Sequence, residues 1–192
     1  MTEKKEARAY VKNIRKISDR DTILANSKLI TEKLISLEII SKYDTLLLYN
    51  SINNEVDTKE LMNYAKKCGK TLAFPTVVGD EMLFYRIDDD KDTKEGYMGI
   101  KEPIVSDDRL IECQNGVIIV PGVAFDKSCN RTGYGKGFYD KYLNKHTELI
   151  KIGLAFSFQI FDELKTDVYD IPLDYVITEE SIYIRRQKYD RT

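Results

Sequence analysis

One strand–helix–strand segment in the first half of the chain constrains the fold more than any other feature. Residues 45–49 (TLLLY) and 71–75 (TLAFP) are apolar runs of strand length. Between them lies a segment with apolar residues at helical spacing, which Asp57 or Thr58 caps and Gly69 ends. Because the connections are short, this order predicts two parallel strands joined by a right-handed crossover. We therefore expect a fold of the α/β class.

Apolar runs farther along the chain extend this pair into a larger sheet. The run at 117–120 (VIIV) is the clearest buried strand. Further strands are expected at 82–87, 152–156 and 175–178, with an edge strand at 182–184. Glycine and proline residues make 88–115 mostly irregular. Since no repeat or linker interrupts the pattern, we expect one domain over 1–192, with a layered, mostly parallel Rossmann-like sheet and helices on both faces.

The N-terminal segment predicts two helices. Residues 3–17 form an amphipathic helix, and Ser18 caps a second helix over 19–41. Four basic residues of the first helix fall within an arc of about 80°. These are Lys4, Arg8, Lys12 and Arg15. The stripe fits a solvated face, but it would complete a phosphate site if the helix lay beside an anion-binding loop.

Charge and composition narrow the class of function. Thirty basic residues against 32 acidic ones give a net charge of −2, which argues against a nucleic-acid coat. No apolar run approaches the ~20 residues needed to span a bilayer, and the polar N-terminal sequence is not a signal peptide. The three scattered cysteines suit a reducing compartment. We expect a cytoplasmic monomer that acts on small molecules, without nucleic-acid or membrane partners.

The single histidine, His146, lies in a polar stretch and fits a solvated helix end. None of the cysteines has a partner at metal-ligand spacing, so a zinc site is not expected. An enzyme of this composition must work with carboxylates, cations and aromatic side chains.

The richest candidate site follows the strand at 117–120. Residues 121–126 (PGVAFD) lead into 131–140 (RTGYGKGFYD), at the strand end where open α/β sheets place ligands. Alternating glycines can direct backbone N–H groups at an anion, and Arg131 and Lys136 add formal charge. The segment differs from a Walker A loop because a glycine follows the Gly-Lys pair. A purely structural glycine turn is the alternative.

Three carboxylates are further candidates. Asp140 and Asp174 are suited to a hard cation such as Mg²⁺, although spacing alone favours a helix cap or a surface charge for each. Glu55 stands just before a helix N-terminus, where acidic residues are favourable, and it could instead accept hydrogen bonds from a polar heterocycle.

Several motifs in order resemble the 5-formyltetrahydrofolate cyclo-ligase family over nearly the whole chain. They are Lys4-x-x-x-Arg8, Glu55-Val56-Asp57-Thr58, Met82-x-Phe84, Gly96-x-x-Gly99-Ile100-x-Glu102-Pro103, Pro121-Gly122-x-Ala124-Phe125-Asp126 and Arg131-x-Gly133-Tyr134-Gly135-Lys136-Gly137-Phe138-Tyr139-Asp140. The last motif is the most specific. The departures are small: Phe138 stands where the family often has tyrosine, and Tyr97 where tryptophan is common.

The resemblance implies a fold similar to the sugar-phosphate isomerase and CoA-transferase architecture. It also implies an ATP- and Mg²⁺-dependent closure of 5-formyltetrahydrofolate to 5,10-methenyltetrahydrofolate, with release of ADP and phosphate, through a phosphorylated formyl (iminium phosphate) intermediate. Such phosphoryl transfer requires positioning and charge neutralisation more than a nucleophilic side chain.

The same resemblance assigns site residues. ATP would contact Lys4, Lys5, Glu6, Ala7, Arg8, Arg131, Thr132, Gly133, Tyr134, Gly135, Lys136, Gly137, Phe138 and Tyr139. The folate would contact Asn50, Glu55, Tyr134, Gly135, Lys136, Gly137 and Phe138. Asp140 and Asp174 would hold Mg²⁺, and Arg131 and Lys136 would be catalytic. Two other classes are kept as alternatives: an isomerase- or CoA-transferase-like enzyme, and a non-catalytic folate- or nucleotide-binding regulator.

Overall fold

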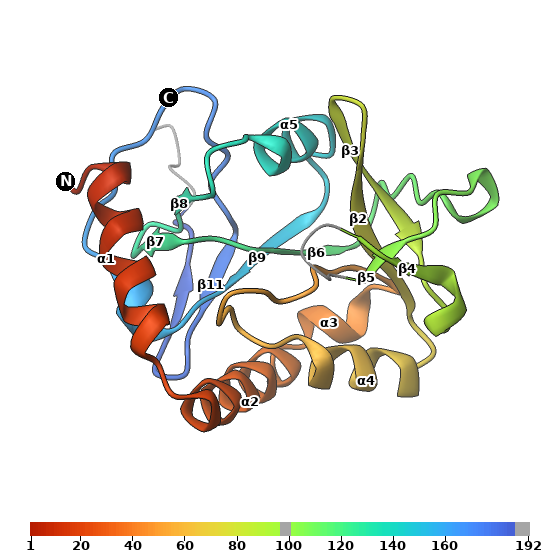
Figure 1. The fold of residues 1–192 in the computed structure, drawn as a ribbon, viewed down its shortest axis with the longest axis horizontal. Helices are drawn as coiled ribbons and strands as arrows, with labels where there is room; N and C mark the ends of the chain where they lie inside the picture. The colour runs from red at the N-terminus through yellow and green to blue at the C-terminus, as the bar shows by residue number, and fades with distance from the viewer. Residues whose placement is uncertain (97–100, 187–192) are drawn as a thin grey trace.

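The computed structural model describes residues 1–96 and 101–186. Within these residues, the centre of the molecule is a seven-stranded sheet in the order β12-β11-β9-β6-β1-β2-β3 (Figure 1). Its strands are β1 (Thr45–Leu47), β2 (Thr71–Val78), β3 (Glu81–Arg86), β6 (Val117–Val120), β9 (Ile150–Leu154), β11 (Tyr175–Ile177) and β12 (Ile182–Ile184). Neighbours from β11 to β2 run parallel, and β3 and β12 are antiparallel edge strands. The predicted mostly parallel sheet is therefore confirmed.

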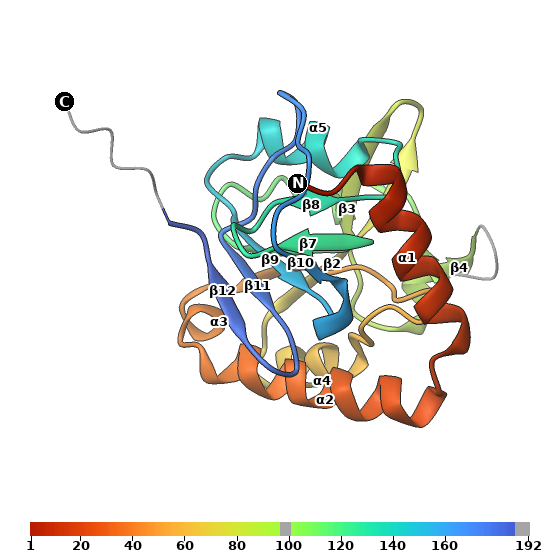
Figure 2. The ribbon, with the colours of Figure 1, turned by 90° about the vertical axis from the view of Figure 1, so that its left-hand side faces the viewer.

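Helices cover both faces of this sheet, but one face is shared with a second sheet. The helices are α1 (Lys4–Ile17), α2 (Arg20–Ser36), α3 (Ile39–Lys42), α4 (Lys59–Lys67) and α5 (Phe138–Lys145). Figure 1 shows α2, α3 and α4 together on one side of the sheet and α5 on the other. A small sheet joins α5 on its side, in the order β10 (Ile160–Phe161), β7 (Ala124–Asp126) and β8 (Arg131–Thr132). Helix α1 packs against this small sheet (Figure 2).

The crossover from β1 through α4 to β2 forms as predicted. Leu46 of β1 lies opposite Leu72 of β2 in a parallel register. Gly69 ends the helix with a φ of +67°, a left-handed conformation that glycine adopts without strain. Thr58 is the N-cap residue, but its hydroxyl donates to the Tyr49 carbonyl instead of capping the helix. This arrangement fixes the loop between β1 and α4, which carries Glu55.

The second helix begins and ends differently from the prediction. Asp19, and not Ser18, caps α2, because its carboxylate accepts a hydrogen bond from the Thr22 N–H at 3.0 Å. Ser18 instead closes α1 through hydrogen bonds to the Ile14 carbonyl. Helix α2 also stops at Ser36, since Leu37 takes an extended conformation and separates α2 from the short α3.

The remaining predicted elements form with shifted ends. The strand expected at 152–156 runs from Ile150 to Leu154, and the edge strand at 182–184 is confirmed. Within 88–115, the structure forms a hairpin of β4 (Thr93–Glu95) and β5 (Lys101–Pro103). The motif positions Gly99 and Ile100, and Tyr97, lie outside the described residues. Among the described residues, no helix combines the length and apolar character needed to cross a membrane.

Candidate active site

The glycine-rich segment lines a cavity of about 700 Å³ beside the carboxyl end of β6. The other walls come from the start of α1, from β2 and β3, and from the segment before β11. Its polar lining includes Lys4, Arg8, Thr76, Glu102, Arg131, Lys136, Asp140, Asp167 and Asp170. Most of the predicted loop residues, from Arg131 to Asp140, therefore face one space.

The backbone of this segment needs glycine at specific positions. Gly135 and Gly137 have φ angles of +101° and +70°, and Gly137 is the residue from which α5 begins. At Gly133, a Cβ atom would lie 2.6 Å from Nη1 of Arg131, so any side chain there would displace the guanidinium. The alternating glycines thus shape the loop around Arg131.

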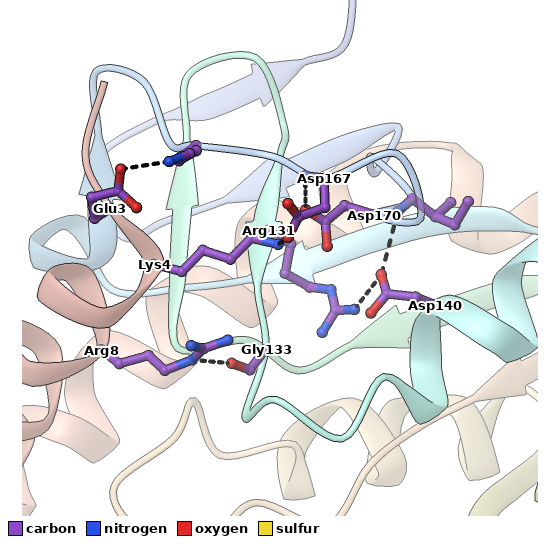
Figure 3. A network of polar contacts seen from close by, with 10 residues as sticks. Glu3, Lys4, Arg8, Arg131, Gly133, Asp140, Asp167 and Asp170 are labelled. Carbon is purple, nitrogen blue, oxygen red and sulfur yellow. Dashed lines mark hydrogen bonds and ion pairs between the residues drawn. The ribbon is translucent and has the colours of Figure 1, made fainter.

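Arg131 is held by a partly buried ion pair with Asp140 (Figure 3). Its Nη2 donates to Oδ1 of Asp140 at 2.9 Å, and its Nη1 donates to the Pro121 carbonyl at 3.2 Å. The Asp140 Oδ1 atom also accepts a hydrogen bond from the Ile171 N–H at 3.3 Å. These contacts join α5, β8, the end of β6 and the segment before β11 around one guanidinium.

Two cations of α1 reach the same cavity. Nζ of Lys4 lies 2.6 Å from Asp167 Oδ2 and 2.5 Å from Asp170 Oδ2. Figure 3 shows the Lys4 side chain extending from α1 toward these aspartates. Burial acts to lower the pKa of Lys4, but the hydrogen bonds with the two carboxylates outweigh it and raise this pKa. Nε of Arg8 donates to the Gly133 carbonyl at 2.8 Å. Helix α1 is therefore fastened to the glycine loop by one of its basic residues.

A second polar cluster connects the loop before α4 with the glycine loop. The Tyr134 hydroxyl donates to Oε1 of Glu55 at 2.5 Å, and Nη1 of Arg15 donates to that hydroxyl at 3.0 Å. Oε2 of Glu55 accepts from the Ile52 N–H at 3.0 Å. Burial raises the pKa of Glu55, although these hydrogen bonds and the Arg15 charge oppose the shift. Burial and the Glu55 charge raise the pKa of Tyr134.

The basic stripe predicted on α1 does not form a uniform solvated face. Lys12 is exposed, Lys4 and Arg8 line the cavity, and Arg15 is only 7% exposed. The placement of Arg15 corrects the interpretation as a solvated face, because the glycine loop covers its guanidinium. Helical periodicity gives the direction of a side chain but does not show which segment packs over it.

Several other predicted residues lie apart from the cavity lining. Lys5 and Glu6 are exposed, and Ala7 is buried against Val123 and neighbouring apolar residues. Nδ2 of Asn50 donates to the Lys101 carbonyl at 2.5 Å.

The two predicted magnesium ligands are not brought together. Oδ2 of Asp174 accepts from the Lys151 N–H at 2.8 Å at the start of β9, whereas Asp140 lines the cavity. In the part of the chain that the structure describes, no group of three or more His, Cys, Asp or Glu side chains forms a metal-binding cluster. Asp140 still fits Mg²⁺, which commonly takes one or two protein carboxylates together with substrate phosphates and water.

Asp167 and Asp170 are site residues that the sequence interpretation missed. They belong to an irregular segment before β11, in which no periodicity or glycine pattern signals a site. Two aspartates three residues apart are the only local signal, and such a pair is common on protein surfaces.

Comparison with known proteins identifies the family. The model of the 5-formyltetrahydrofolate cyclo-ligase family matches residues 1–179. The chain belongs to this family. Its curated relatives include the cyclo-ligase of Mycoplasma pneumoniae, 34% identical over 138 residues, covering 71% of this chain and 73% of the relative. The mouse cyclo-ligase is 28% identical over 191 residues, covering 93% of this chain and 94% of the relative.

Solved structures of 5,10-methenyltetrahydrofolate synthetases share the fold. The NMR structure of the Aquifex aeolicus protein superposes with a TM-score of 0.82 at 35% identity, covering 98% of this chain and 95% of that one. The Mycoplasma pneumoniae structure gives a TM-score of 0.71 at 27% identity, covering 92% and 98%. The cyclo-ligase family and its fold are thus confirmed, and the chain is an enzyme of the ligase class in folate one-carbon metabolism. The predicted likeness to isomerases and CoA-transferases stays a prediction.

Proposed function

We propose that this cyclo-ligase family member converts 5-formyltetrahydrofolate to 5,10-methenyltetrahydrofolate at the expense of ATP, through a phosphorylated formyl intermediate. One observation carries the proposal: a single cavity is lined by the cations and glycines suited to a polyphosphate, and its Tyr134 contacts the buried Glu55. ATP and the folate must meet at the formyl oxygen. The glycine loop lies between the proposed polyphosphate end of the cavity and the proposed folate end at Glu55.

The chemistry has two steps. The formyl oxygen attacks the γ-phosphorus of ATP, forming a new P–O bond while the bond to the β,γ-bridging oxygen breaks and ADP leaves. Nitrogen 10 then attacks the formyl carbon, its proton is lost, and the C–O bond breaks with release of phosphate. The product is the cationic methenyl bridge. Because phosphate is a far better leaving group than oxide, ATP makes the ring closure possible.

The polyphosphate end is assigned to the loop and to α1. The assigned residues are Lys4, Lys5, Glu6, Ala7, Arg8 and Arg131 to Tyr139, with Arg131 and Lys136 catalytic. Arg131 is already fixed by Asp140 and the Pro121 carbonyl, so its charge needs little reorganisation during the reaction. Lys136 is exposed and free to follow the transferring phosphoryl group. Lys4 would exchange its two aspartate partners for phosphate oxygens.

Magnesium is assigned to Asp140 and Asp174, with Asp140 as the carboxylate already in the cavity. When bound, the ion would neutralise phosphate charge. The assignment of Asp174 depends on the family resemblance alone. The protein's own contribution is to orient Asp140 through Arg131 and the Ile171 N–H.

The folate end is assigned to Asn50, Glu55 and the segment from Tyr134 to Phe138. An ionised, buried carboxylate is a strong acceptor for the N–H groups of a pterin ring. In the structure, the Tyr134 hydroxyl donates a hydrogen bond to Oε1 of Glu55. A pterin N–H group would have to replace this hydroxyl to bind the same oxygen. We also propose that the enzyme acts as a cytoplasmic monomer, without nucleic-acid or membrane partners.

The test is to mix the purified protein with 5-formyltetrahydrofolate, ATP and Mg²⁺ and to follow the methenyl product by its near-ultraviolet absorbance. A rise that requires all three components, with one ADP formed per product, supports the proposal. No rise, with folate and ATP both binding in calorimetry, would instead indicate a regulator. No rise and no folate binding would indicate an isomerase- or transferase-like enzyme.

A further inference from the structure

Arg15 is a buried cation that the proposed mechanism leaves unused. It lies in the last turn of α1 and is only 7% exposed. Arginine is seldom buried without a partner, because removing its charge from water is costly unless hydrogen bonds or an opposite charge compensate. The surroundings of Arg15 therefore show what its burial stabilises.

Three separate segments converge on this residue. Its Nη1 donates to the Tyr134 hydroxyl at 3.0 Å, and its Nη2 donates to the Gly122 carbonyl at 3.1 Å. Nη1 also lies 4.0 Å from Oε1 of Glu55. The backbone carbonyl of Arg15 in turn accepts a hydrogen bond from Nδ2 of Asn54 at 2.8 Å. The segment after β6, the glycine loop and the loop before α4 are thus joined to helix α1 at Arg15.

This arrangement matters most when a ligand binds. The Glu55 side chain is 4% exposed, and its Oε1 now accepts from Tyr134. A substrate N–H that took over this oxygen would displace the Tyr134 hydroxyl. Arg15 would then be the cation nearest to Glu55, and without it a carboxylate would stay buried with no opposite charge.

We propose that Arg15 is a positioning residue for folate recognition, which holds the Glu55 carboxylate ionised and oriented toward the N–H donors of the substrate ring. The inference rests on the proposed function and adds a residue to its folate end. Arg15 acts through Glu55 and Tyr134, so its loss affects the folate and leaves the nucleotide unaffected. That selectivity separates it from Lys4, Lys5 and Arg8, the basic residues of α1 that are assigned to ATP.

The test compares Arg15→Gln, Arg15→Lys and Glu55→Gln with the matched control Lys16→Gln, which removes an exposed charge from the adjacent position. For Arg15→Gln, we expect KM for 5-formyltetrahydrofolate to rise about tenfold or more, and KM for ATP to stay within about twofold. Arg15→Lys keeps the charge but loses the two-pronged geometry, so a smaller rise of about threefold to tenfold is expected. Lys16→Gln should match the wild type.

A double-mutant cycle separates positioning from a general structural defect. If Arg15 acts through Glu55, adding Arg15→Gln to Glu55→Gln should change the folate KM by less than about twofold. The inference is overturned if the rises in folate KM caused by Arg15→Gln and Glu55→Gln multiply in the double variant. It is also overturned if Arg15→Gln raises KM for ATP as much as KM for the folate, or leaves the folate KM at the wild-type value. Should Arg15→Gln fail to fold in thermal unfolding, Arg15→Lys decides, and a wild-type folate KM in that variant overturns the inference as well. If the wild-type protein forms no methenyl product, the proposed function itself is refuted.

Discussion

Removing Arg131 should destabilise the protein by an amount set by the burial of its ion pair. The Arg131 side chain is 4% exposed and that of Asp140 is 21% exposed. Truncating one partner of a fully buried pair costs about 3–5 kcal/mol, whereas an exposed pair contributes about 0–1 kcal/mol. Because Asp140 retains some contact with water and the Ile171 N–H, we expect Arg131→Met to cost about 2–3 kcal/mol. Methionine preserves much of the apolar stem, so most of this loss is electrostatic.

Thermal and urea unfolding measure this cost. For a chain of 192 residues, about 2–4 °C of melting temperature corresponds to each kcal/mol, so a decrease of about 4–12 °C is expected. Asp140→Asn in the same chain removes the unpaired charge and should restore part of the loss. Lys127→Met is the matched control, since its pair with Asp162 has side chains 59% and 90% exposed and should contribute little. Two results would refute this expectation. One is a loss of unfolding free energy in Arg131→Met no larger than that in Lys127→Met. The other is a double variant whose loss equals the sum of the Arg131→Met and Asp140→Asn losses.

Three further predictions concern catalysis, packing and pH. Lys136→Ala should reduce kcat at least about tenfold without lowering the melting temperature, because its side chain is exposed and is assigned to the bound substrates and not to the packing of the fold; a wild-type turnover rate would remove it from the mechanism. Gly153→Ala should cost about 1–3 kcal/mol in urea unfolding, because its Cβ would lie 2.7 Å from Cε1 of Phe125, and unchanged stability would contradict this packing. Backbone N–H groups, together with Arg109, lower the pKa of Asp92 below its ordinary value of 3.8. The ionised Asp92 carboxylate therefore stabilises the folded protein fully above pH 3.8, and this contribution is lost as the pH falls through the lowered pKa. Asp92→Asn should therefore destabilise the protein at neutral pH and progressively less in acid, and a pH-independent difference would contradict the assignment.

The main sheet could be predicted because its signals are local. The apolar run at 117–120 and the helix between 45–49 and 71–75 each carry their pattern within a few residues. Helix ends were less predictable, since Ser18 and Asp19 are both good capping residues and only the backbone shows which one faces the free N–H groups.

The candidate site was predictable in part for the same reason. The glycine loop is contiguous in sequence, so its residues from Arg131 to Asp140 meet at one cavity. Arg15 and Asp170 depend on contacts between segments more than a hundred residues apart, and no periodicity reports such contacts. The family resemblance implied a metal-binding role for Asp174, but its carboxylate accepts a hydrogen bond from the Lys151 N–H near the start of β9.

The most direct test of the proposed reaction follows the formyl oxygen. In the proposed reaction, this atom attacks the γ-phosphorus and leaves as part of phosphate. The measurement is to supply 5-formyltetrahydrofolate carrying ¹⁸O in the formyl group and to analyse the released phosphate by mass spectrometry. We expect one ¹⁸O atom in each phosphate formed with the methenyl product. Unlabelled phosphate, with the ¹⁸O recovered in water, would contradict activation of the formyl group by phosphorylation.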